Sequence, residues 1–195
     1  MKKVVPDKAV LIPDTATPVF AGKIFDVYQW PQTLFDGSVV TFEMLRRPDT
    51  VVAICIVGDK LLVLQDEQSH AGLQQHFPGG RMEKGEDTLA AAQREVAEET
   101  GYTFHKWRLL AVRQPEAKIE WFIYVYLAWD MTAKGDAQPD AGEKITAELL
   151  PLAEVKRLAA IEASDMAESR ALLEGCADVS ALLTLPTFAG QEIDR

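Results

Sequence analysis

Cysteine and histidine are scarce in this chain, which has two cysteines and three histidines among its 195 residues. A disulfide framework or a zinc site needs several such side chains at short spacing, so the sequence indicates neither. Cys55 lies inside the apolar run VVAICIV and is predicted to be a small buried hydrophobic residue. The chemistry of the chain has to be sought in other side chains.

Long apolar runs are also missing, because no stretch reaches the roughly 18 uncharged apolar residues of a membrane-spanning helix. The N-terminal stretch MKKVVPDKAVLIPD has only broken apolar pieces and lacks the apolar core of a signal peptide. We therefore expect a cytoplasmic protein with no membrane partner.

Positive charge is in the minority, with 20 Lys and Arg against 30 Asp and Glu and a formal net charge of −10. This balance argues against binding to nucleic acid through its phosphate backbone. It leaves a small anionic substrate open, because a bound divalent cation inverts the local sign of the charge. The chain length and a hydrophobic fraction of 48% predict one globular domain with a substantial core.

Strand and turn signals dominate the first half of the chain. Residues 1–20 are rich in Pro, Asp and Thr and predict an irregular or edge segment. Two strand-like runs within residues 22–45 flank the dipeptide Asp36-Gly37, which is typical of hairpin turns. The runs 51–57 and 61–65 are apolar at nearly every position, which predicts two strands with both faces covered.

A helix is predicted for residues 87–100, which contain neither Pro nor Gly and are rich in Ala and Glu. Asp87 suits the N-cap, and Gly101 suits the position after the last turn. Two strands, a polar loop and further helices follow, with the helices beginning at residue 151. This order predicts a mixed α/β domain with helices on both sides of a sheet.

The predicted helix carries three glutamates whose spacing brings their carboxylates together. Glu95 and Glu99 are four residues apart and Glu98 is three from Glu95, so all three share one side of the helix. Hard oxygen ligands of this kind suit Mg²⁺ or Mn²⁺, which leave other positions to water and substrate phosphate. Upstream, Pro78-Gly79-Gly80 predicts a turn without blocking side chains, whose carbonyls could add a ligand. The alternative is an ordinary solvated helix face.

The spacing of the charged residues forms a longer pattern, G-x5-E-x7-R-E-V-x-E-E-x-G, with fixed letters at Gly80, Glu86, Arg94, Glu95, Glu98, Glu99 and Gly101. This pattern resembles the Nudix box, the signature of the Nudix hydrolases. The resemblance implies an α/β/α sandwich with a mixed sheet, here with N-terminal antiparallel strands and extra C-terminal helices. It also implies an enzyme that hydrolyses phosphoanhydride bonds with Mg²⁺ or Mn²⁺ as cofactor.

The resemblance also implies roles for particular residues of the box. The implied metal ligands are Glu95, Glu99, Glu98 and the carbonyl of Gly79 or Gly80. Glu98 is in addition a candidate for orienting the attacking water. Glu86 and Arg94 are expected to hold the carboxylates in place, as metal sites generally require.

Two further functions are expected outside the box. Glu143 is the candidate general base and Asp140 the alternative, although both are also explained as acids of a surface loop. Arg46 and Arg47 are candidates for binding a substrate phosphate, because a guanidinium matches the geometry of phosphate oxygens. The alternative for each arginine is a structural salt bridge at the end of a strand.

Residues 25–57 are similar to the branch of the family that acts on ADP-ribose and nucleoside diphosphate sugars. The implied reaction is hydrolysis of the diphosphate linkage, giving a nucleoside monophosphate and a sugar phosphate. One alternative is a hydrolase of nucleoside triphosphates or dinucleoside polyphosphates, and another is a non-catalytic nucleotide-binding module. The resemblance also implies a homodimer formed through residues 1–45, with residues 46–195 as the Nudix domain.

Overall fold

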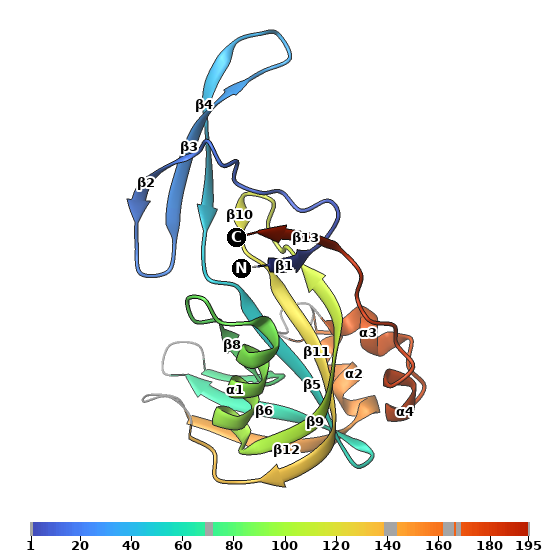
Figure 1. Cartoon of the computed structure of the whole chain (residues 1–195). Coiled ribbons are helices and arrows are strands. Elements are labelled where there is room, and N and C mark those ends of the chain that lie inside the picture. The colour runs from blue at the N-terminus through green and yellow to red at the C-terminus, as the bar shows by residue number, and fades with distance from the viewer. Residues whose placement is uncertain (1, 69–71, 139–143, 162–165, 167–168, 195) are drawn as a thin grey trace.

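A seven-stranded sheet forms the centre of the protein (Figure 1). The computed structural model describes residues 2–68, 72–138, 144–161, 166 and 169–194. The strand order is β12-β6-β5-β11-β9, and β7 pairs with β6 while β8 pairs with β5. The strands are β5 (Thr50–Val57), β6 (Lys60–Gln68), β7 (Gly72–His76), β8 (Gly79–Arg81), β9 (Tyr102–Arg113), β11 (Ile123–Lys134) and β12 (Lys144–Pro151).

The pair β5 and β11 is parallel, and the other strand pairs of this sheet are antiparallel. Successive residues of β5 point to opposite faces, so Ile54 and Ile56 join one hydrophobic cluster while Ala53 and Cys55 join another. Both faces of β5 and β6 are therefore buried, which confirms the prediction from their continuous apolar runs. Cys55 is buried, as predicted.

Helices cover both faces of the sheet (Figure 1). Val96 of α1 (Thr88–Thr100) packs on one face, and Val155 of α2 (Leu152–Ala159) packs on the other. Two short helices, α3 (Arg170–Glu174) and α4 (Val179–Leu182), add to the second face. The predicted α/β/α sandwich with extra C-terminal helices is confirmed. Among the described residues, no helix has both the length and the apolar character needed to cross a membrane.

A second, four-stranded sheet has the order β10-β4-β3-β2. Its strands are β2 (Thr17–Ala21), β3 (Asp26–Thr33), β4 (Val39–Arg46) and β10 (Ile119–Glu120). The predicted hairpin is confirmed, since β3 and β4 are joined at Gly37, which has φ 84°. In Figure 1 this hairpin projects away from the main body. Strand β1 (Lys2–Val5) pairs with β13 (Gln191–Asp194) and so joins the two ends of the chain.

Two local predictions are wrong. The segment before residue 151 was predicted to be a loop, but Lys144–Pro151 forms the edge strand β12, paired with β6 along its length. Pro78-Gly79-Gly80 was predicted to be a turn, but Gly79 to Arg81 form β8 against β5. A Cβ atom on Gly79 would lie 2.1 Å from the carbonyl oxygen of Val51, so the glycine lets the two backbones approach closely.

Candidate active site

Helix α1 has the ends that the sequence predicts, and these ends fix the position of its glutamates. The carboxylate of Asp87 accepts hydrogen bonds from the backbone N–H groups of Leu89 at 2.9 Å and Ala90 at 3.3 Å. Gly101 has φ 71° and donates its backbone N–H to the carbonyl of Ala97. The helix thus has a complete N-cap and a left-handed glycine at its C-terminal end.

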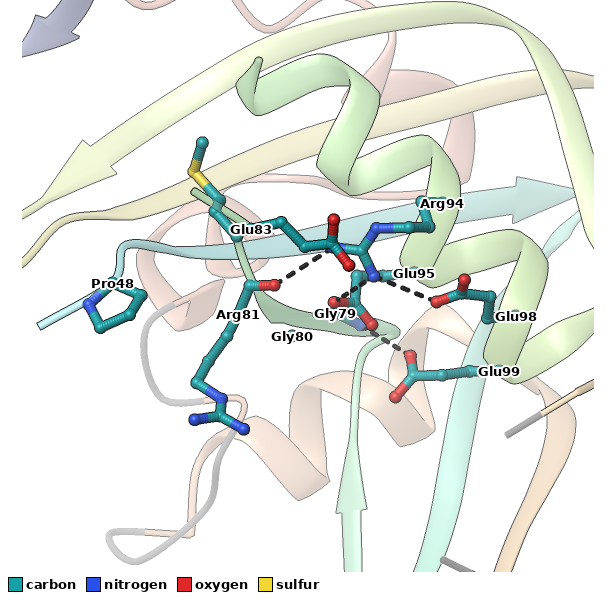
Figure 2. A pocket seen from close by; sticks show the side chains of 10 residues that line it. Pro48, Gly79, Gly80, Arg81, Glu83, Arg94, Glu95, Glu98 and Glu99 are labelled. Carbon is teal, nitrogen blue, oxygen red and sulfur yellow. Dashed lines mark hydrogen bonds and ion pairs between the residues drawn. The ribbon is translucent and has the colours of Figure 1, made fainter. Parts of the chain in front are cut away.

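The short strand β8 lies directly against the acidic side of α1 (Figure 2). The backbone N–H of Gly79 donates to Oε2 of Glu99 at 2.9 Å. A Cβ atom on Gly80 would lie only 2.6 Å from the carboxyl group of Glu95. The two glycines therefore let the β8 backbone approach the carboxylates closely.

Arg94 connects the parts of the box. Its Nε and Nη2 donate to the two oxygens of Glu86, each at 2.9 Å, and Nη1 donates to Glu95 at 2.9 Å and Glu98 at 3.0 Å. Nη2 also donates to the carbonyl of Arg81 at 3.2 Å. A guanidinium has five N–H donors, and these contacts use all five. The structure thus brings Glu86, Arg94, Glu95 and Glu98 together, while their part in turnover stays a prediction.

The carboxylates of the box differ in their electrostatic environment. Burial raises the pKa of Glu95, although the hydrogen bond from Arg94 opposes this effect. The hydrogen bonds from Arg94 lower the pKa of Glu86, whose carboxylate is held in its charged form. The Glu98 side chain is 48% exposed, compared with 14% for Glu95. A bound cation would therefore stabilise the charged form of the Glu95 carboxylate.

The donor set of the site suits a hard divalent cation. Glu95, Glu98 and Glu99 line a cavity of about 400 Å³ together with Gly79 and Gly80, so all the candidate ligands are oxygens. Within the part of the chain that the structure describes, no three acidic, histidine or cysteine side chains are grouped to enclose an ion on their own. Mg²⁺ does not need such a cage, because it commonly uses one or two carboxylates and completes its shell with water and substrate phosphate.

A second cavity of about 650 Å³ adjoins the first and shares Pro48, Met82 and Glu83 with it. Its remaining wall residues come from β1, the start of β3, the end of β4 and the residues after it, the box loop, β10 and the residue before β11: Lys3, Asp26, Arg46, Arg47, Asp49, Lys84, Gly85, Glu86, Glu120 and Phe122. A cavity lined by carboxylates therefore opens beside a cavity whose wall carries both basic and acidic side chains.

The two arginines predicted to bind phosphate have different surroundings. The guanidinium of Arg46 donates to Glu120, with Nη2 at 2.8 Å, and to the hydroxyl of Tyr28 at 3.1 Å. Arg47 instead lies over the ring of Trp121, 4.3 Å from its centroid. Both line the second cavity, and phosphate binding by either stays a prediction. The candidate bases Glu143 and Asp140 lie outside the described residues.

Lys3, Asp49 and Arg81 are among the wall residues that the sequence reasoning missed. The Nζ of Lys3 donates to Oδ2 of the buried Asp49 at 2.6 Å, and Oδ1 of Asp49 accepts from the backbone N–H of Phe122 at 2.9 Å. Lys3 reaches the site through the pairing of β1 with β13, for which the sequence carries no signal. Arg81 lies at a variable position of the box, so the motif gives no indication of a role for it.

Comparison with known proteins identifies the family. A model of the NUDIX domain matches residues 46–172, which is more than half of the chain. The chain belongs to the NUDIX family. The family that the sequence resembles is thereby confirmed.

Two curated relatives of this NUDIX chain are each 30% identical to it. An ADP-ribose pyrophosphatase of Bacillus subtilis (strain 168) matches over 118 residues, 58% of this chain and 63% of the relative. A methanol dehydrogenase activator of Bacillus methanolicus matches over 124 residues, 61% of this chain and 66% of the relative. The match therefore spans less than two thirds of the length of either relative.

A solved structure supports the fold. The crystal structure of an ADP compounds hydrolase superposes with a TM-score of 0.66 at 21% identity, covering 83% of this chain and 90% of the other. At this level of identity the likeness shows the shared architecture.

Proposed function

We propose that this chain hydrolyses the diphosphate linkage of ADP-ribose or another nucleoside diphosphate sugar, giving a nucleoside monophosphate and a sugar phosphate. The observation that carries the proposal is the adjoining pair of cavities, one lined by Glu95, Glu98 and Glu99 and the other carrying basic as well as acidic side chains, Arg47 among the basic ones. Phosphoanhydride hydrolysis needs charge stabilisation and an oriented water at one phosphorus, and it needs the rest of the substrate to be held in place. The name of the Bacillus subtilis relative points to the same substrate.

The chain's own residues would divide the work as follows. Glu95 and Glu99, with the carbonyl of Gly79, would hold Mg²⁺ or Mn²⁺, which when bound supplies positive charge to the phosphate oxygens. Glu98, the most exposed of the three glutamates, would orient the water that attacks phosphorus while the bridging oxygen leaves. Glu143 remains the proposed general base.

Arg94 and Glu86 would keep the carboxylates in position during turnover. Their bidentate pair ties the box loop to α1, and the remaining donors of Arg94 hold Glu95 and Glu98. Hydrogen bonds between charged groups are shorter and stronger than neutral ones, which suits a positioning role.

Glu99→Gln tests the proposal with little disturbance to the fold. Glutamine has the same shape and retains an oxygen that can accept the hydrogen bond from the Gly79 backbone, but it lacks the negative charge. We expect the variant to lose most of its turnover of ADP-ribose at saturating Mg²⁺ and to keep its melting temperature. The exposed Glu154→Gln is the matched control and should behave as wild type. Near wild-type turnover in Glu99→Gln would remove the box from the mechanism.

The substrate class is tested by a product assay over a panel of nucleotides with Mg²⁺ and with Mn²⁺. The proposal expects AMP and ribose 5-phosphate from ADP-ribose. Release of pyrophosphate from nucleoside triphosphates, with ADP-ribose inert, would replace it with the triphosphate alternative. Binding of nucleotides without hydrolysis of any would replace it with a non-catalytic module.

We also propose that the chain forms a homodimer through residues 1–45, with residues 46–195 as the catalytic unit. The second sheet supports this proposal, because large apolar side chains are exposed along it and its turns. They are Val19, Phe20, Ile24, Phe25, Leu34, Phe35, Val39 and Val40. An exposed apolar surface of this kind on a projecting hairpin is typical of a protein interface.

A further inference from the structure

Two arginines lie at the junction of the two cavities. Arg81 lines the cavity of the carboxylates and Arg47 lines the second cavity, while Pro48, next to Arg47 in the chain, belongs to both. Arg81 pairs with Thr50 in the contact between β8 and β5, so the strand pairing brings it close to residue 47. Burial lowers the pKa of Arg47, and the positive charge of Arg81 lowers it further. The two guanidiniums are therefore near enough to repel each other.

Neither guanidinium has a carboxylate within ion-pair distance among the described residues. Arg46 and Arg94, in contrast, each bind at least one acidic side chain. The Nε of Arg47 is buried and has no hydrogen-bond acceptor in the described structure. A buried N–H group without an acceptor is unfavourable, and so is a pair of neighbouring positive charges. A single anion bound between the two arginines would accept the hydrogen bond and offset the repulsion.

Aromatic side chains, and not acids, hold Arg47 in place. Its guanidinium lies 4.3 Å from the ring centroid of Trp121 and 5.7 Å from that of Phe25. The indole N–H of Trp121 donates to the hydroxyl of Thr50 at 3.0 Å, which fixes the orientation of the ring. Contacts with ring faces leave the N–H groups at the edge of the guanidinium available to a ligand.

Arg81 is an exposed residue. Figure 2 shows its side chain extending away from the carboxylates of Glu98 and Glu99. Its backbone carbonyl accepts a hydrogen bond from Arg94, which holds the main chain while the guanidinium stays clear of the acidic cluster.

We propose that Arg47 and Arg81 together bind the phosphate that is not attacked, in a second phosphate site between the two cavities. The inference rests on the proposed function and adds Arg81 as a substrate-binding residue and Trp121 as a residue that positions Arg47. The carboxylates and their cation act on one phosphate, and the arginine pair donates hydrogen bonds to the other. The site thereby selects ligands with two linked phosphates.

The test is isothermal titration of the full-length protein with ADP-ribose in EDTA, where no turnover takes place. Arg47→Gln and Arg81→Gln should each weaken binding about tenfold to 100-fold, the range expected for loss of a charge-assisted hydrogen bond. Adenosine, which has no phosphate, should bind these variants as it binds wild type. Lys106→Gln removes one charge from an exposed ion pair with Asp130 and is the matched control.

A titration of two variants of Trp121 tests the positioning role. Trp121→Leu removes the aromatic ring and should weaken ADP-ribose binding. Trp121→Phe keeps an aromatic ring and should retain most of the wild-type affinity for ADP-ribose. A purely structural role would show as a lowered melting temperature in both variants with equal affinities.

The failure of the site is distinguishable from the failure of the proposed function. Unchanged affinity in Arg81→Gln, or no ADP-ribose binding by the wild-type protein in EDTA, overturns the arginine pair. A protein that binds ADP-ribose through these arginines but hydrolyses no diphosphate leaves the pair standing and counts only against the hydrolytic proposal.

Discussion

Gly80→Ala tests whether turnover depends on where the carboxylate of Glu95 lies and not only on its presence. A Cβ atom on Gly80 would lie 2.6 Å from the carboxyl carbon and both carboxyl oxygens of Glu95. Favourable contact between carbon atoms lies at about 3.5–4.0 Å, so the carboxylate must move by about 1 Å. The obstructing atoms are the end of a flexible side chain, so the backbone can keep its position.

The expected loss is large in rate and small in stability. A displacement of about 1 Å at a catalytic group can cost on the order of 10²-fold in rate. A side chain forced off its rotamer costs about 0.5–1.5 kcal/mol, which lowers the melting temperature of a chain of this size by about 1–6 °C. The hydrogen bond from Arg94 to Glu95, now 2.9 Å, would lengthen as well.

The neighbouring glycine should respond in a different way. A Cβ atom on Gly79 would meet backbone atoms, the carbonyl oxygen of Val51 at 2.1 Å and the Cα of Val52 at 2.9 Å. These atoms belong to β5 in the central sheet, so Gly79→Ala must displace β8 itself. Overpacking of this kind costs about 1–3 kcal/mol or more. The Gly79 variant should therefore lose stability as well as activity.

The assay is turnover of ADP-ribose at saturating Mg²⁺, measured beside thermal unfolding for each variant. Gly175→Ala is the control, because no atom lies within 4 Å of its Cβ position and its φ of −73° suits alanine. The control should match wild type in both measurements. Wild-type turnover in Gly80→Ala would refute the argument that close approach of β8 sets the carboxylate position.

Two further predictions concern the interface and the acid dependence of stability. Phe20→Ser combined with Phe35→Ser should halve the mass measured by light scattering, whereas a monomeric wild-type protein would contradict the proposed dimer. The hydrogen bonds from Arg94 lower the pKa of Glu86 below its usual 4.5. The charged Glu86 carboxylate therefore stabilises the fold fully above pH 4.5. This stabilisation is lost as the pH falls through the lowered pKa of the folded state. Melting curves from pH 6 to pH 3 should fall more steeply for wild type than for Glu86→Gln, and parallel curves would count against the ion pair.

Local signals allowed α1 to be predicted with its ends. The N-cap Asp87, the left-handed Gly101 and the absence of Pro and Gly between them act within a few residues, so the sequence alone specifies the helix. Strand β12 has no such signal. It is an edge strand with exposed polar residues such as Lys144 and Thr146, and its conformation depends on pairing with the distant β6.

The candidate site also has a part that local sequence signals predict and a part that depends on tertiary contacts. The motif contains Glu95, Glu98, Glu99 and Arg94, because all of them lie on one helix at fixed spacing. Lys3 and Asp49 are 46 positions apart and meet only through tertiary contacts, so no local pattern could pair them. The turn predicted for Gly79 and Gly80 was wrong because the need for glycine comes from the approach of β8 to β5 and α1, which the sequence does not display.

The distribution of ion pairs accounts for how a chain with a net charge of −10 can present positive charge to an anionic ligand. Arg94 directs all five donors within the box, and Arg46 is paired with the buried Glu120. The acids that orient these two arginines also offset part of their positive charge. Arg47 is held by aromatic rings, so its charge is not neutralised by the contact that orients it. It follows that the ring of Trp121 orients Arg47 without offsetting its charge. An acid in place of Trp121 would still hold the guanidinium of Arg47 but would remove its attraction for phosphate.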